Sequence, residues 1–431
     1  MTNRRSFIKQ SGKLAAGLAF YGAAGQFTRA QGPGNRMRIA VMGLGRGLDL
    51  VRAGLDISNT EIVYVCDVDQ ERIARAQKIV SEKQQTPVRP ETDVRRILDD
   101  RNVDALFVAA PNHWHGPATI MACQAGKHVY VEKPACHNPW EGEMMVRVAR
   151  QNARLKVQMG NQRRSWPGMI EAINKLREGA IGQLRYARCW YNNSRTSIGR
   201  GQAAPVPAHL DYALWQGPAP DRPYKDNLVH YNWHWQWHWG NGELGNNGIH
   251  ALDVARWGLG VAFPSRVSCE GNRYHFYDDQ ETPDTGVAAY DFGKVGITWD
   301  WSSCHPRANE KLPFVTFYGE GGTMELHGGG YRVFDIKGKQ LEQHDAPGGD
   351  RIHVENFFEA IRNRNGRLNS EIGEGVISTH LCHLGNIAWR TSQTLTVEQT
   401  TGHIEKNAAA QKLWKREYRK GWEPKIVVKR D

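Results

Sequence analysis

The sequence predicts an α/β protein in which an N-terminal Rossmann domain, built on a doubly wound parallel sheet, precedes a C-terminal α+β domain with a large open, mostly antiparallel sheet. Over the first 160 residues, apolar stretches of strand length alternate with helical stretches, as in parallel sheets. In residues 295–301, Val, Ile and two Trp alternate with Gly, Thr and Asp, which indicates a half-buried antiparallel strand. The 431 residues exceed one typical core, so we expect two domains.

The composition is that of a globular chain and excludes some classes of partner. The formal charge is +11, but residues 1–30 carry five basic and no acidic residues, so the rest of the chain carries only +6. We interpret this remainder as a solvated basic surface and expect no nucleic-acid partner. The seven cysteines are scattered and include no C-x-x-C pair, which favours buried free thiols over disulfides or a metal site.

The N-terminus resembles a twin-arginine export signal. Asn3-Arg4-Arg5-Ser6-Phe7-Ile8-Lys9 precedes a weakly apolar segment, residues 14–24, that is too short to span a bilayer. Thr28-Arg29-Ala30 then offers small residues to a signal peptidase. The alternative is a chance Arg-Arg pair in a disordered tail. The signal predicts a periplasmic or otherwise exported protein, with the twin-arginine translocase as a partner during export. No cysteine follows the cleavage site, so no membrane anchor is expected.

A glycine-rich turn follows the first predicted strand. The apolar residues 37–42 run directly into Gly43-Leu44-Gly45-Arg46-Gly47. Glycines let a backbone turn tightly against a pyrophosphate, and the N-terminus of the next helix supplies free N–H groups. The match to G-x-G-x-x-G is imperfect, because the third glycine should fall at Leu48.

The second predicted strand, residues 62–66, ends at Asp67, which lies 24 residues after Gly43. An acid at this distance binds the adenosine ribose hydroxyls in Rossmann domains and repels a 2′-phosphate, so NAD is favoured over NADP. Asp69 is the alternative candidate, although its position beyond the strand also suits a cap of the next helix.

Two further strand ends carry polar groups. The strand at residues 105–109 leads to Pro111, Asn112 and His115, and a helix is expected from about 117 to 125. The strand at 128–131 ends in Glu132-Lys133-Pro134. Ligands of open α/β sheets bind beyond the carboxyl ends of the strands. We therefore expect four strand ends to converge on one site, with Lys133 as its reactive group.

The second half predicts a large sheet with helices on it. Expected strands lie at 184–191, 285–292, 295–301, 314–319, 323–326 and 331–334, and expected helices at 167–178, 251–259, 353–362 and 375–391. The tail from residue 407 predicts a peripheral helix and an extended end.

Residues 230–239 are rich in tryptophan and histidine. If this run is extended, its four tryptophans share one face, and His234 and His238 share the other. The tryptophans either pack in a core or subunit contact, or one or two of them, with Trp233 as the candidate, stack on a sugar. The histidines would share a face only on a helix, so no metal binding is expected here.

These motifs together resemble the glucose–fructose oxidoreductase/inositol dehydrogenase (Gfo/Idh/MocA) family. The resemblance rests on the glycine-rich turn, Cys66 to Asp69, Ala110 to Asn112 with His115, Glu132-Lys133-Pro134, and Gly160 to Arg164 with Pro167. It implies that Lys133 lies beside the nicotinamide and the reacting carbon, and that chains oligomerise through the open sheet. Together with the strand-end motifs, it predicts these cofactor-binding residues: Gly43, Leu44, Gly45, Arg46, Gly47, Asp67, Pro111, Asn112, His115, Glu132, Lys133 and Asn161.

The family's second catalytic motif is an acid, three residues and a histidine. His250 matches the histidine, but Asn246 stands where the acid is expected. An amide can orient a hydroxyl but cannot take a proton. Lys133 and His250 are therefore the acid/base candidates, with their division of roles open. Asp253, one turn further on, is a candidate to orient His250.

Arg163 and Arg164 are candidates for binding an oxygen-rich substrate or the cofactor, with ordinary surface arginine as the alternative for at least one of them. The expected boundaries are a signal peptide at 1–30, an NAD(P)-binding Rossmann domain at 36–160, a substrate-binding and oligomerisation domain at 161–400 and a tail at 401–431.

The resemblance predicts an NAD(P)-dependent oxidoreductase that transfers a hydride from a sugar, polyol or glycoside hydroxyl. The export signal suggests a tightly bound cofactor, because the periplasm has no obvious supply of free NAD. One alternative is a redox-neutral glycosidase or lyase that oxidises its sugar transiently. Another is a non-enzymatic sugar or nucleotide sensor on the same fold.

Overall fold

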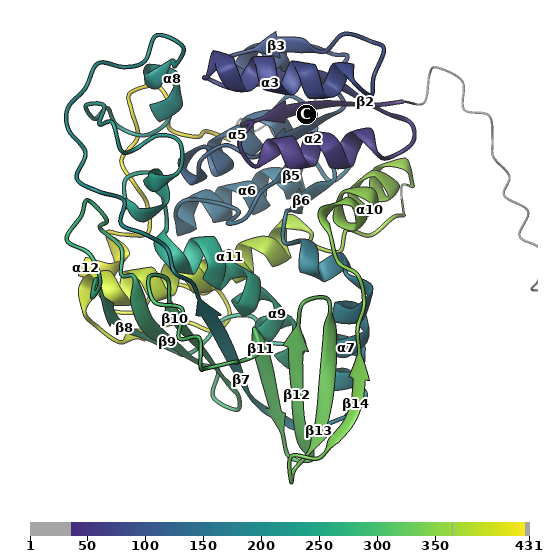
Figure 1. The fold of residues 1–431 in the computed structure, drawn as a ribbon, viewed down its shortest axis with the longest axis vertical. Coiled ribbons are helices and arrows are strands. Elements are labelled where there is room, and N and C mark those ends of the chain that lie inside the picture. Colours follow the sequence, from purple (N-terminus) through teal and green to yellow (C-terminus); the bar gives the residue numbers. More distant parts are fainter. Residues whose placement is uncertain (1–35, 364, 427–431) are drawn as a thin grey trace, which may run out of the picture. The chain divides into compact units, whose positions relative to one another are not determined.

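The computed structural model describes residues 36–363 and 365–426. The predicted export signal at 1–30 and residues 427–431 of the predicted tail lie outside the described residues. The first part of the described chain is a six-stranded parallel sheet in the order β3-β2-β1-β4-β5-β6 (Figure 1). Its strands are β1 Met37–Met42, β2 Thr60–Cys66, β3 Arg89–Glu91, β4 Ala105–Val108, β5 His128–Val131 and β6 Val157–Met159.

Helices lie on both faces of this sheet, so its central strands are apolar throughout. The helices are α2 Gly47–Leu55, α3 Gln70–Ser81, α4 Val94–Leu98, α5 Asn112–Gln124 and α6 Pro139–Gln151, together with α10 Asp350–Arg362 from late in the chain. Ile39 and Val41 share one buried cluster with Phe357 and Phe358 of α10, whereas Ala40 belongs to the cluster on the other face. Helix α10 thus lies beside α2 against the Rossmann sheet (Figure 1).

The second part is a nine-stranded sheet in the order β14-β13-β12-β11-β7-β10-β9-β8-β15. Its strands are β7 Leu184–Asn192, β8 Arg266–Asn272, β9 Thr285–Asp291, β10 Gly296–Ser302, β11 Val315–Gly319, β12 Gly322–His327, β13 Gly330–Asp335, β14 Gln340–His344 and β15 Leu395–Thr396. Only the β7–β10 pair is parallel. This mostly antiparallel sheet and the parallel Rossmann sheet confirm the predicted fold class.

One face of the large sheet packs on helices and the other is open. The covering helices are α7 Pro167–Arg177, α9 Ile249–Leu259 and α11 Ile372–Thr391. In β10, Ile297, Trp299 and Trp301 are buried, as the period-two pattern predicts, whereas Val287 and Tyr318 are exposed. Short helices, α8 Tyr212–Gln216 and α12 Ala408–Gln411, lie outside these layers.

Two local expectations are wrong. Residues Asn232–Trp235 form a 3-10 helix, so the tryptophan run is not extended and its four rings do not share one face. Helix α5 begins at Asn112 rather than near Pro117, because Pro111 precedes it as the N-cap and its first nine residues are all buried.

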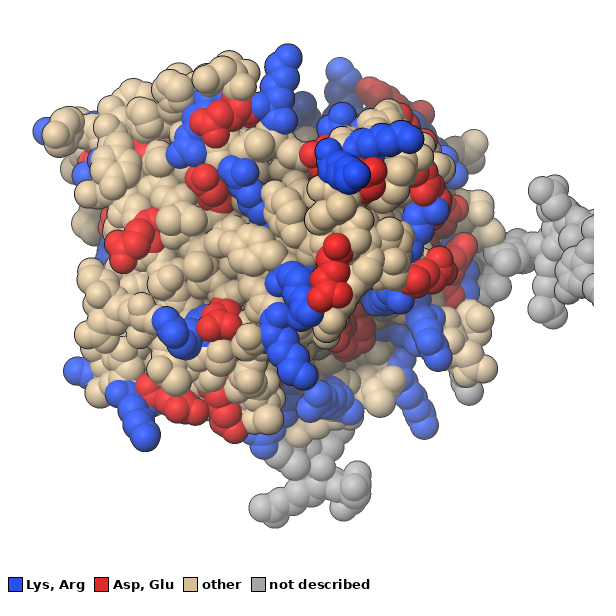
Figure 2. All heavy atoms as spheres, turned by 90° about the horizontal axis from the view of Figure 1, so that it is seen from below, with Lys and Arg blue, Asp and Glu red and all other residues tan. Residues whose placement is uncertain are grey.

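The surface carries both signs of charge. Lys and Arg are interspersed with Asp and Glu on the face seen in Figure 2. Among the helices in the described part of the chain, none combines the length and apolar character needed to cross a bilayer.

Candidate active site

A cavity of about 480 Å³ lies at the carboxyl ends of β1, β2, β4 and β5. The predicted site residues that line it are Gly43, Gly45, Arg46, Asp67, Pro111, Asn112, His115, Glu132, Lys133, Trp233 and Asn246. The four strand ends therefore meet at one cavity. Leu44, Gly47, Asn161, Arg163, Arg164, His250 and Asp253 are not among its lining residues.

The turn after β1 approaches its neighbours too closely for any side chain at its first glycine. Gly43 has φ +85°, and a Cβ there would lie 2.5 Å from the backbone of Ala109. Gly47 opens α2 and is buried against Val41, so Leu48 can occupy the place of the third glycine. Within the described residues, no side chain caps the N-terminus of α2. This cradle fits a pyrophosphate bound by backbone N–H groups.

Asp67 is held in place by the backbone around it. Its Oδ2 accepts a 2.6 Å hydrogen bond from the Leu44 N–H, and its Oδ1 accepts one of 3.1 Å from Asp69. Burial raises the pKa of Asp67, although these N–H groups and Arg72 oppose that shift. The alternative candidate, Asp69, instead accepts from the N–H groups of Glu71 and Arg72 as the N-cap of α3. Asp67 is thus the acid that faces the cavity.

Arg46 links the cavity to α10. Its guanidinium donates to both oxygens of Asp350, at 2.6 and 2.7 Å, and to Glu132 at 3.1 Å. Burial works against the charge of Arg46, but Glu132 and Asp350 hold its pKa above the ordinary value. Burial raises the pKa of Glu132, which Arg46 and Lys133 oppose. The Glu132 side chain therefore sits in a fixed ion network behind Lys133.

Lys133 faces the start of α9. Its Nζ donates to the backbone carbonyl of Asn246 at 2.7 Å and to the Asn246 amide oxygen at 3.3 Å. Burial lowers the pKa of Lys133, and neighbouring Arg46 lowers it further against the opposing effect of Glu132. The Lys133–Pro134 peptide is cis. An amine with a lowered pKa is a suitable proton acceptor.

Asn246 and His250 are brought together by an irregular helix. Leu244–Gly248 is a π-helical turn that continues into α9, and such turns often occur at functional sites. His250 Nδ1 is buried without a hydrogen-bond partner among the described residues. Burial and the charges of Lys133 and Arg163 lower the pKa of His250 well below its usual value. The imidazole is therefore neutral at pH 7 and binds a proton only weakly.

Three predicted site residues, Asn161, Arg164 and Asp253, bond to one another and do not line the cavity. Asp253 does not bond to His250; it forms a buried ion pair with Arg164, 2.8 Å from the guanidinium Nη2, and accepts a 2.7 Å hydrogen bond from Asn161. The Asn161 amide oxygen accepts from Ser370. Because these polar groups bind one another and do not line the cavity, their orientations are explained without a ligand.

Arg163 also lies outside the cavity lining. It donates to the carbonyl of Gly328 at 3.0 Å, and its guanidinium stacks on Phe314 at 4.2 Å and on Trp166 at 4.6 Å. Burial lowers the pKa of Arg163 to about 10. These contacts explain its orientation without a ligand.

The tryptophan run divides between core and cavity. Trp235 and Trp239 are buried, and Trp237 lies against Trp389. Trp233 lines the cavity, where its ring stacks on His234 at 3.6 Å and its Nε1 donates to the carbonyl of His230. The lining residues that sequence analysis did not assign to the site include Arg72, Trp215, Tyr231 and His234. Only the last two, beside Trp233, carried a signal that could have found them.

Residues 207–234, the covering segment, are hydrogen-bonded to the Rossmann domain. The Gln70 N–H donates to the carbonyl of His209 at 3.0 Å, and the Asp211 N–H donates to Val68 at 2.9 Å. His230 lies 2.7 Å from the Asp69 carboxylate. The segment supplies five of the residues that line the cavity, namely Trp215, His230, Tyr231, Trp233 and His234.

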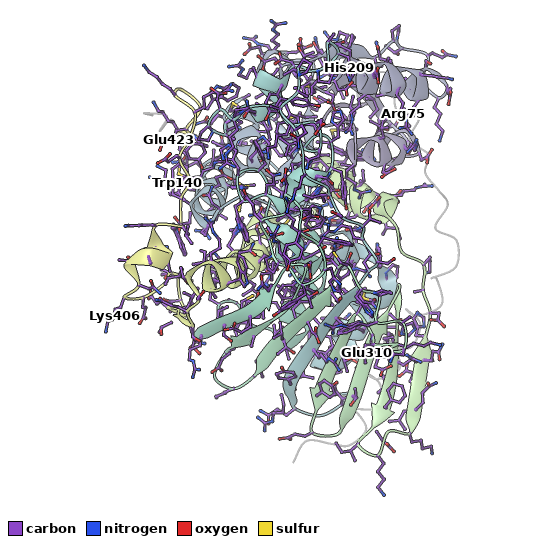
Figure 3. All side chains as sticks on the ribbon, turned by 60° about the vertical axis from the view of Figure 1, so that its left-hand side comes forward. Arg75, Trp140, His209, Glu310, Lys406 and Glu423 are labelled. Carbon is purple, nitrogen blue, oxygen red and sulfur yellow. The ribbon has the colours of Figure 1, made fainter. Side chains whose placement is uncertain are left out.

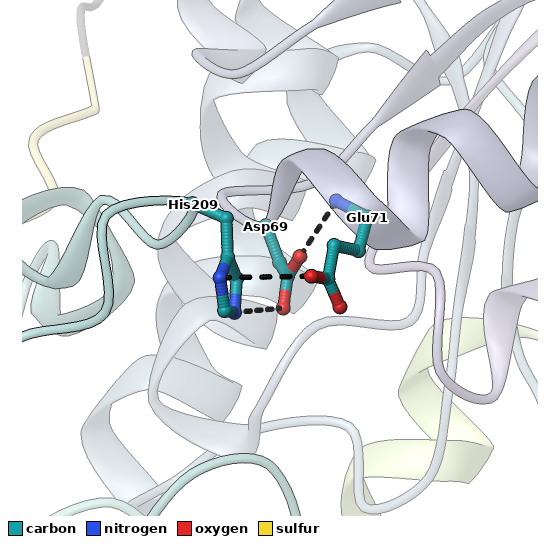
Figure 4. Close-up of side chains that lie close together, drawn as sticks. All are labelled: Asp69, Glu71 and His209. Atoms are coloured by element: carbon teal, nitrogen blue, oxygen red, sulfur yellow. Dashed lines mark hydrogen bonds and ion pairs between the residues drawn. The ribbon is translucent and has the colours of Figure 1, made fainter.

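His209 reinforces this attachment. Its two ring nitrogens each lie 3.8 Å from a carboxylate, that of Asp69 and that of Glu71 (Figure 4). Figure 3 labels His209 among the Rossmann elements. The turn between β2 and α3 is thus the anchor point of the covering segment.

Family models match both parts of the chain. The model described as an oxidoreductase family with an NAD-binding Rossmann fold matches residues 37–161, and the one for the C-terminal alpha/beta domain of that oxidoreductase family matches residues 190–424. The chain belongs to the Gfo/Idh/MocA family of oxidoreductases.

Relatives differ in what their names describe. A glycosyl hydrolase family 109 protein of Parabacteroides distasonis is 29% identical over 385 residues, which cover 82% of this chain and 77% of that protein. The inositol 2-dehydrogenase of Salmonella typhimurium is 26% identical over 149 residues, 34% of this chain and only 43% of the relative.

Solved structures share the fold. The WlbA dehydrogenase of Bordetella pertussis, in complex with NADH and UDP-GlcNAcA, superposes with a TM-score of 0.63 at 20% identity, covering 84% of this chain and 99% of that one. The aldose-aldose oxidoreductase of Caulobacter crescentus, complexed with glycerol, gives a TM-score of 0.64 at 18% identity, covering 84% and 100%.

Proposed function

We propose that this protein is an NAD-dependent oxidoreductase that acts on a sugar, polyol or glycoside hydroxyl and keeps its cofactor bound between turnovers. The main support for this proposal is the cavity at four strand ends, with the Gly43 cradle and Asp67 at one end and Lys133 at the other. Bound NAD would accept the hydride from the carbon that carries the substrate hydroxyl. Gly43, Gly45, Asp67 and Asn112 would hold it.

The residues around Lys133 provide the acid/base chemistry. The hydroxyl proton passes to Lys133 Nζ, whose lowered pKa leaves more of the free amine near neutral pH, or to the neutral imidazole of His250. Asn246, bonded to Lys133, orients the hydroxyl through its amide but takes no proton. The buried Arg164–Asp253 pair keeps the end of β6 and helix α9 in fixed positions.

The covering segment supports retention of the cofactor. It reaches over the cavity from the second domain and is anchored at Asp69, next to the acid that holds the ribose. Release of the nucleotide would require this attachment to open. A retained cofactor suits the predicted export, since a twin-arginine substrate is translocated folded and could carry a nucleotide loaded in the cytoplasm.

A second candidate is redox-neutral glycoside cleavage, in which the sugar is oxidised, loses its aglycone and is reduced again. The match to a glycosyl hydrolase family 109 protein over 82% of this chain favours it. Both candidates use the same cavity and differ in whether NADH accumulates.

Mass spectrometry of nucleotide released from denatured, natively purified protein tests the shared element. We expect close to one NAD per chain. Protein that carries no nucleotide, yet binds added NAD weakly and reversibly, would contradict the retained cofactor. Incubation with glycosides then separates the candidates, because net oxidation accumulates reduced nicotinamide and redox-neutral cleavage releases sugar without it.

A further inference from the structure

A second cavity, of about 410 Å³, lies apart from the nucleotide cavity and shares no lining residue with it. Asn241 separates the two, because its side chain accepts from Asn112 on the nucleotide side and donates to the carbonyl of His137 on the other. The second cavity is formed by the loop before α6, residues 220–222 and 237–241, the end of α11 and the C-terminal segment at 413–417.

Four cationic side chains line this second cavity: Arg222, Arg390, Lys415 and Arg416. Lys415 pairs with Glu423 and lies 4.1 Å from the ring centroid of Trp140; Figure 3 labels both of these partners. Arg222 lies 3.8 Å from Glu281. In contrast, no described carboxylate lies within ion-pair distance of Arg390 or Arg416.

The carboxylates nearby are engaged elsewhere or lie apart. Asp221 pairs with Arg419, and Glu417 is exposed at the rim. Glu141 is buried behind Arg416, where it accepts hydrogen bonds from Tyr418 and from the His137 N–H. The charge of Glu141 attracts Arg416, but no ion pair forms between the two side chains. Burial lowers the pKa of Arg416, and neither Arg416 nor Arg390 has a carboxylate partner among the described residues, so the cavity favours an anion that would face them.

The orientation of Arg416 is fixed in advance. Its Nε donates to the carbonyl of Glu417 at 3.1 Å, and its Nη1 lies 3.4 Å from Nδ1 of His137. The other ring nitrogen of His137 lies 3.1 Å from the carbonyl of Trp237 and donates to it. Burial and the charge of Arg416 hold the pKa of His137 well below its usual value, so this histidine is neutral and accepts from the arginine.

The remaining lining suits a sugar ring. Trp237 presents an aromatic surface, with the Arg390 guanidinium 5.0 Å from its ring centroid. Asn138, His238 and Asn386 add polar groups around it. The volume is within the range of small-ligand pockets. Arginine binds carboxylates through paired hydrogen bonds, and tryptophan offers a flat apolar face.

We propose that this cavity is a second binding site, for a saccharide that carries a carboxylate, such as a hexuronate residue. Arg390 and Arg416 bind the carboxylate, and Trp237 contacts the ring. The site is independent of hydride transfer, because none of its residues lines the nucleotide cavity.

Isothermal titration calorimetry of the NAD-retaining protein at low salt tests this site with three probes: D-glucuronate, D-glucose and inorganic sulfate. We expect saturable glucuronate binding and at least about tenfold weaker binding of glucose and sulfate. In the R390Q/R416Q double variant, the affinity for glucuronate should fall at least about tenfold. Arg185→Gln, at an exposed arginine paired with Glu320 on the large sheet, is the matched control and should bind as the wild type does.

Absence of saturable glucuronate binding would overturn the proposal, and so would equal binding of glucose or sulfate. Full binding by R390Q/R416Q would do the same. Because Arg390 is exposed, R390Q alone keeps the test valid if the double variant fails to fold, and it should itself weaken glucuronate binding severalfold. Retained NAD and an unchanged melting temperature verify that each variant is folded.

Discussion

At the scale of single residues, Asn246 has the greatest influence on the proton chemistry. Its amide oxygen lies 3.3 Å from Lys133 Nζ, at the position where the resemblance to the family led us to expect an acid. A neutral partner leaves the pKa of Lys133 lowered by burial, and a carboxylate there would raise it. The identity of this one side chain thus determines the pH range in which Lys133 is a free base.

Asn246→Asp tests this. A carboxylate beside Nζ should raise the pKa of Lys133, and the acidic limb of the kcat/KM profile should move to higher pH by about one unit or more. Asn246→Ala, which removes the amide without adding charge, should lower the rate but leave the limb within a few tenths of a unit. A limb that stays in place in the Asp variant would show that Lys133 is not the titrating base.

Individual ion pairs were beyond prediction from sequence. Arg164 and Asp253 lie 89 positions apart, and nothing in either local pattern indicates that they neutralise each other. Their contact depends on how the 3-10 helix Gln162–Ser165 packs on α9, which is a property of the tertiary structure. In contrast, Gly43, Asp67 and Lys133 could be predicted because each lies just after the end of a predicted strand.

At the scale of elements, the turn between β1 and α2 is the most constrained. Gly43→Ala would place a Cβ 2.5 Å from the backbone of Ala109 and also strain the left-handed conformation. We expect a stability loss of about 2 kcal/mol or more and loss of retained NAD. The nucleotide content of the natively purified variant measures the second effect.

Gly126→Ala is the matched control for this turn. Gly126 also has a positive φ, but a Cβ there meets nothing within 4 Å. The variant should lose only about 1 kcal/mol from backbone strain and keep its NAD. Equal effects of the two substitutions would contradict the close approach at Gly43.

The covering segment gives a second prediction at this scale. His230→Ala removes the 2.7 Å contact with Asp69, so bound NAD should dissociate at least about tenfold faster. His209→Ala removes only contacts of 3.8 Å at a more exposed ring and should change the rate less than threefold. Exchange with labelled NAD measures both rates. An unchanged rate of NAD release in His230→Ala would show that the covering segment does not retain the cofactor.

Elements with strong periodicity were predictable, and those without it were not. The alternation in β10 predicts its buried face, and the continuous apolar runs predict β1 and β5. The strands β3, β14 and β15 are short or polar and form only because a neighbouring strand offers free backbone groups. The attachment of the covering segment likewise depends on pairing across distant parts of the chain.

At the scale of the whole molecule, buried histidines make stability depend on pH. Burial lowers the pKa of His115, His353 and His380 to about 4, although each also has a partner at a backbone carbonyl. Between pH 6.5 and 4 the unfolded chain binds protons that the folded chain does not. The free energy of unfolding therefore falls as pH falls through this window, by up to about 3 kcal/mol per histidine.

Melting temperatures from pH 7.5 to 4.5 check this expectation. We expect a steady decline that begins near pH 6.5. His380→Gln, which keeps a donor toward the Gly402 carbonyl without a titrating ring, should flatten part of the decline. A melting temperature that is constant down to pH 4.5 would contradict the neutral state of these side chains.

The central claim is that Lys133 serves hydride transfer to a nicotinamide that stays in its cavity. Single-turnover absorbance in the reduced-nicotinamide band, recorded after mixing NAD-retaining protein with a panel of sugars and glycosides, tests it most directly. With a substrate of the wild type, Lys133→Ala should keep its NAD but reduce it at least about 1,000-fold more slowly, while Lys175→Ala should match the wild type. Unchanged reduction of bound NAD in Lys133→Ala would contradict the claim.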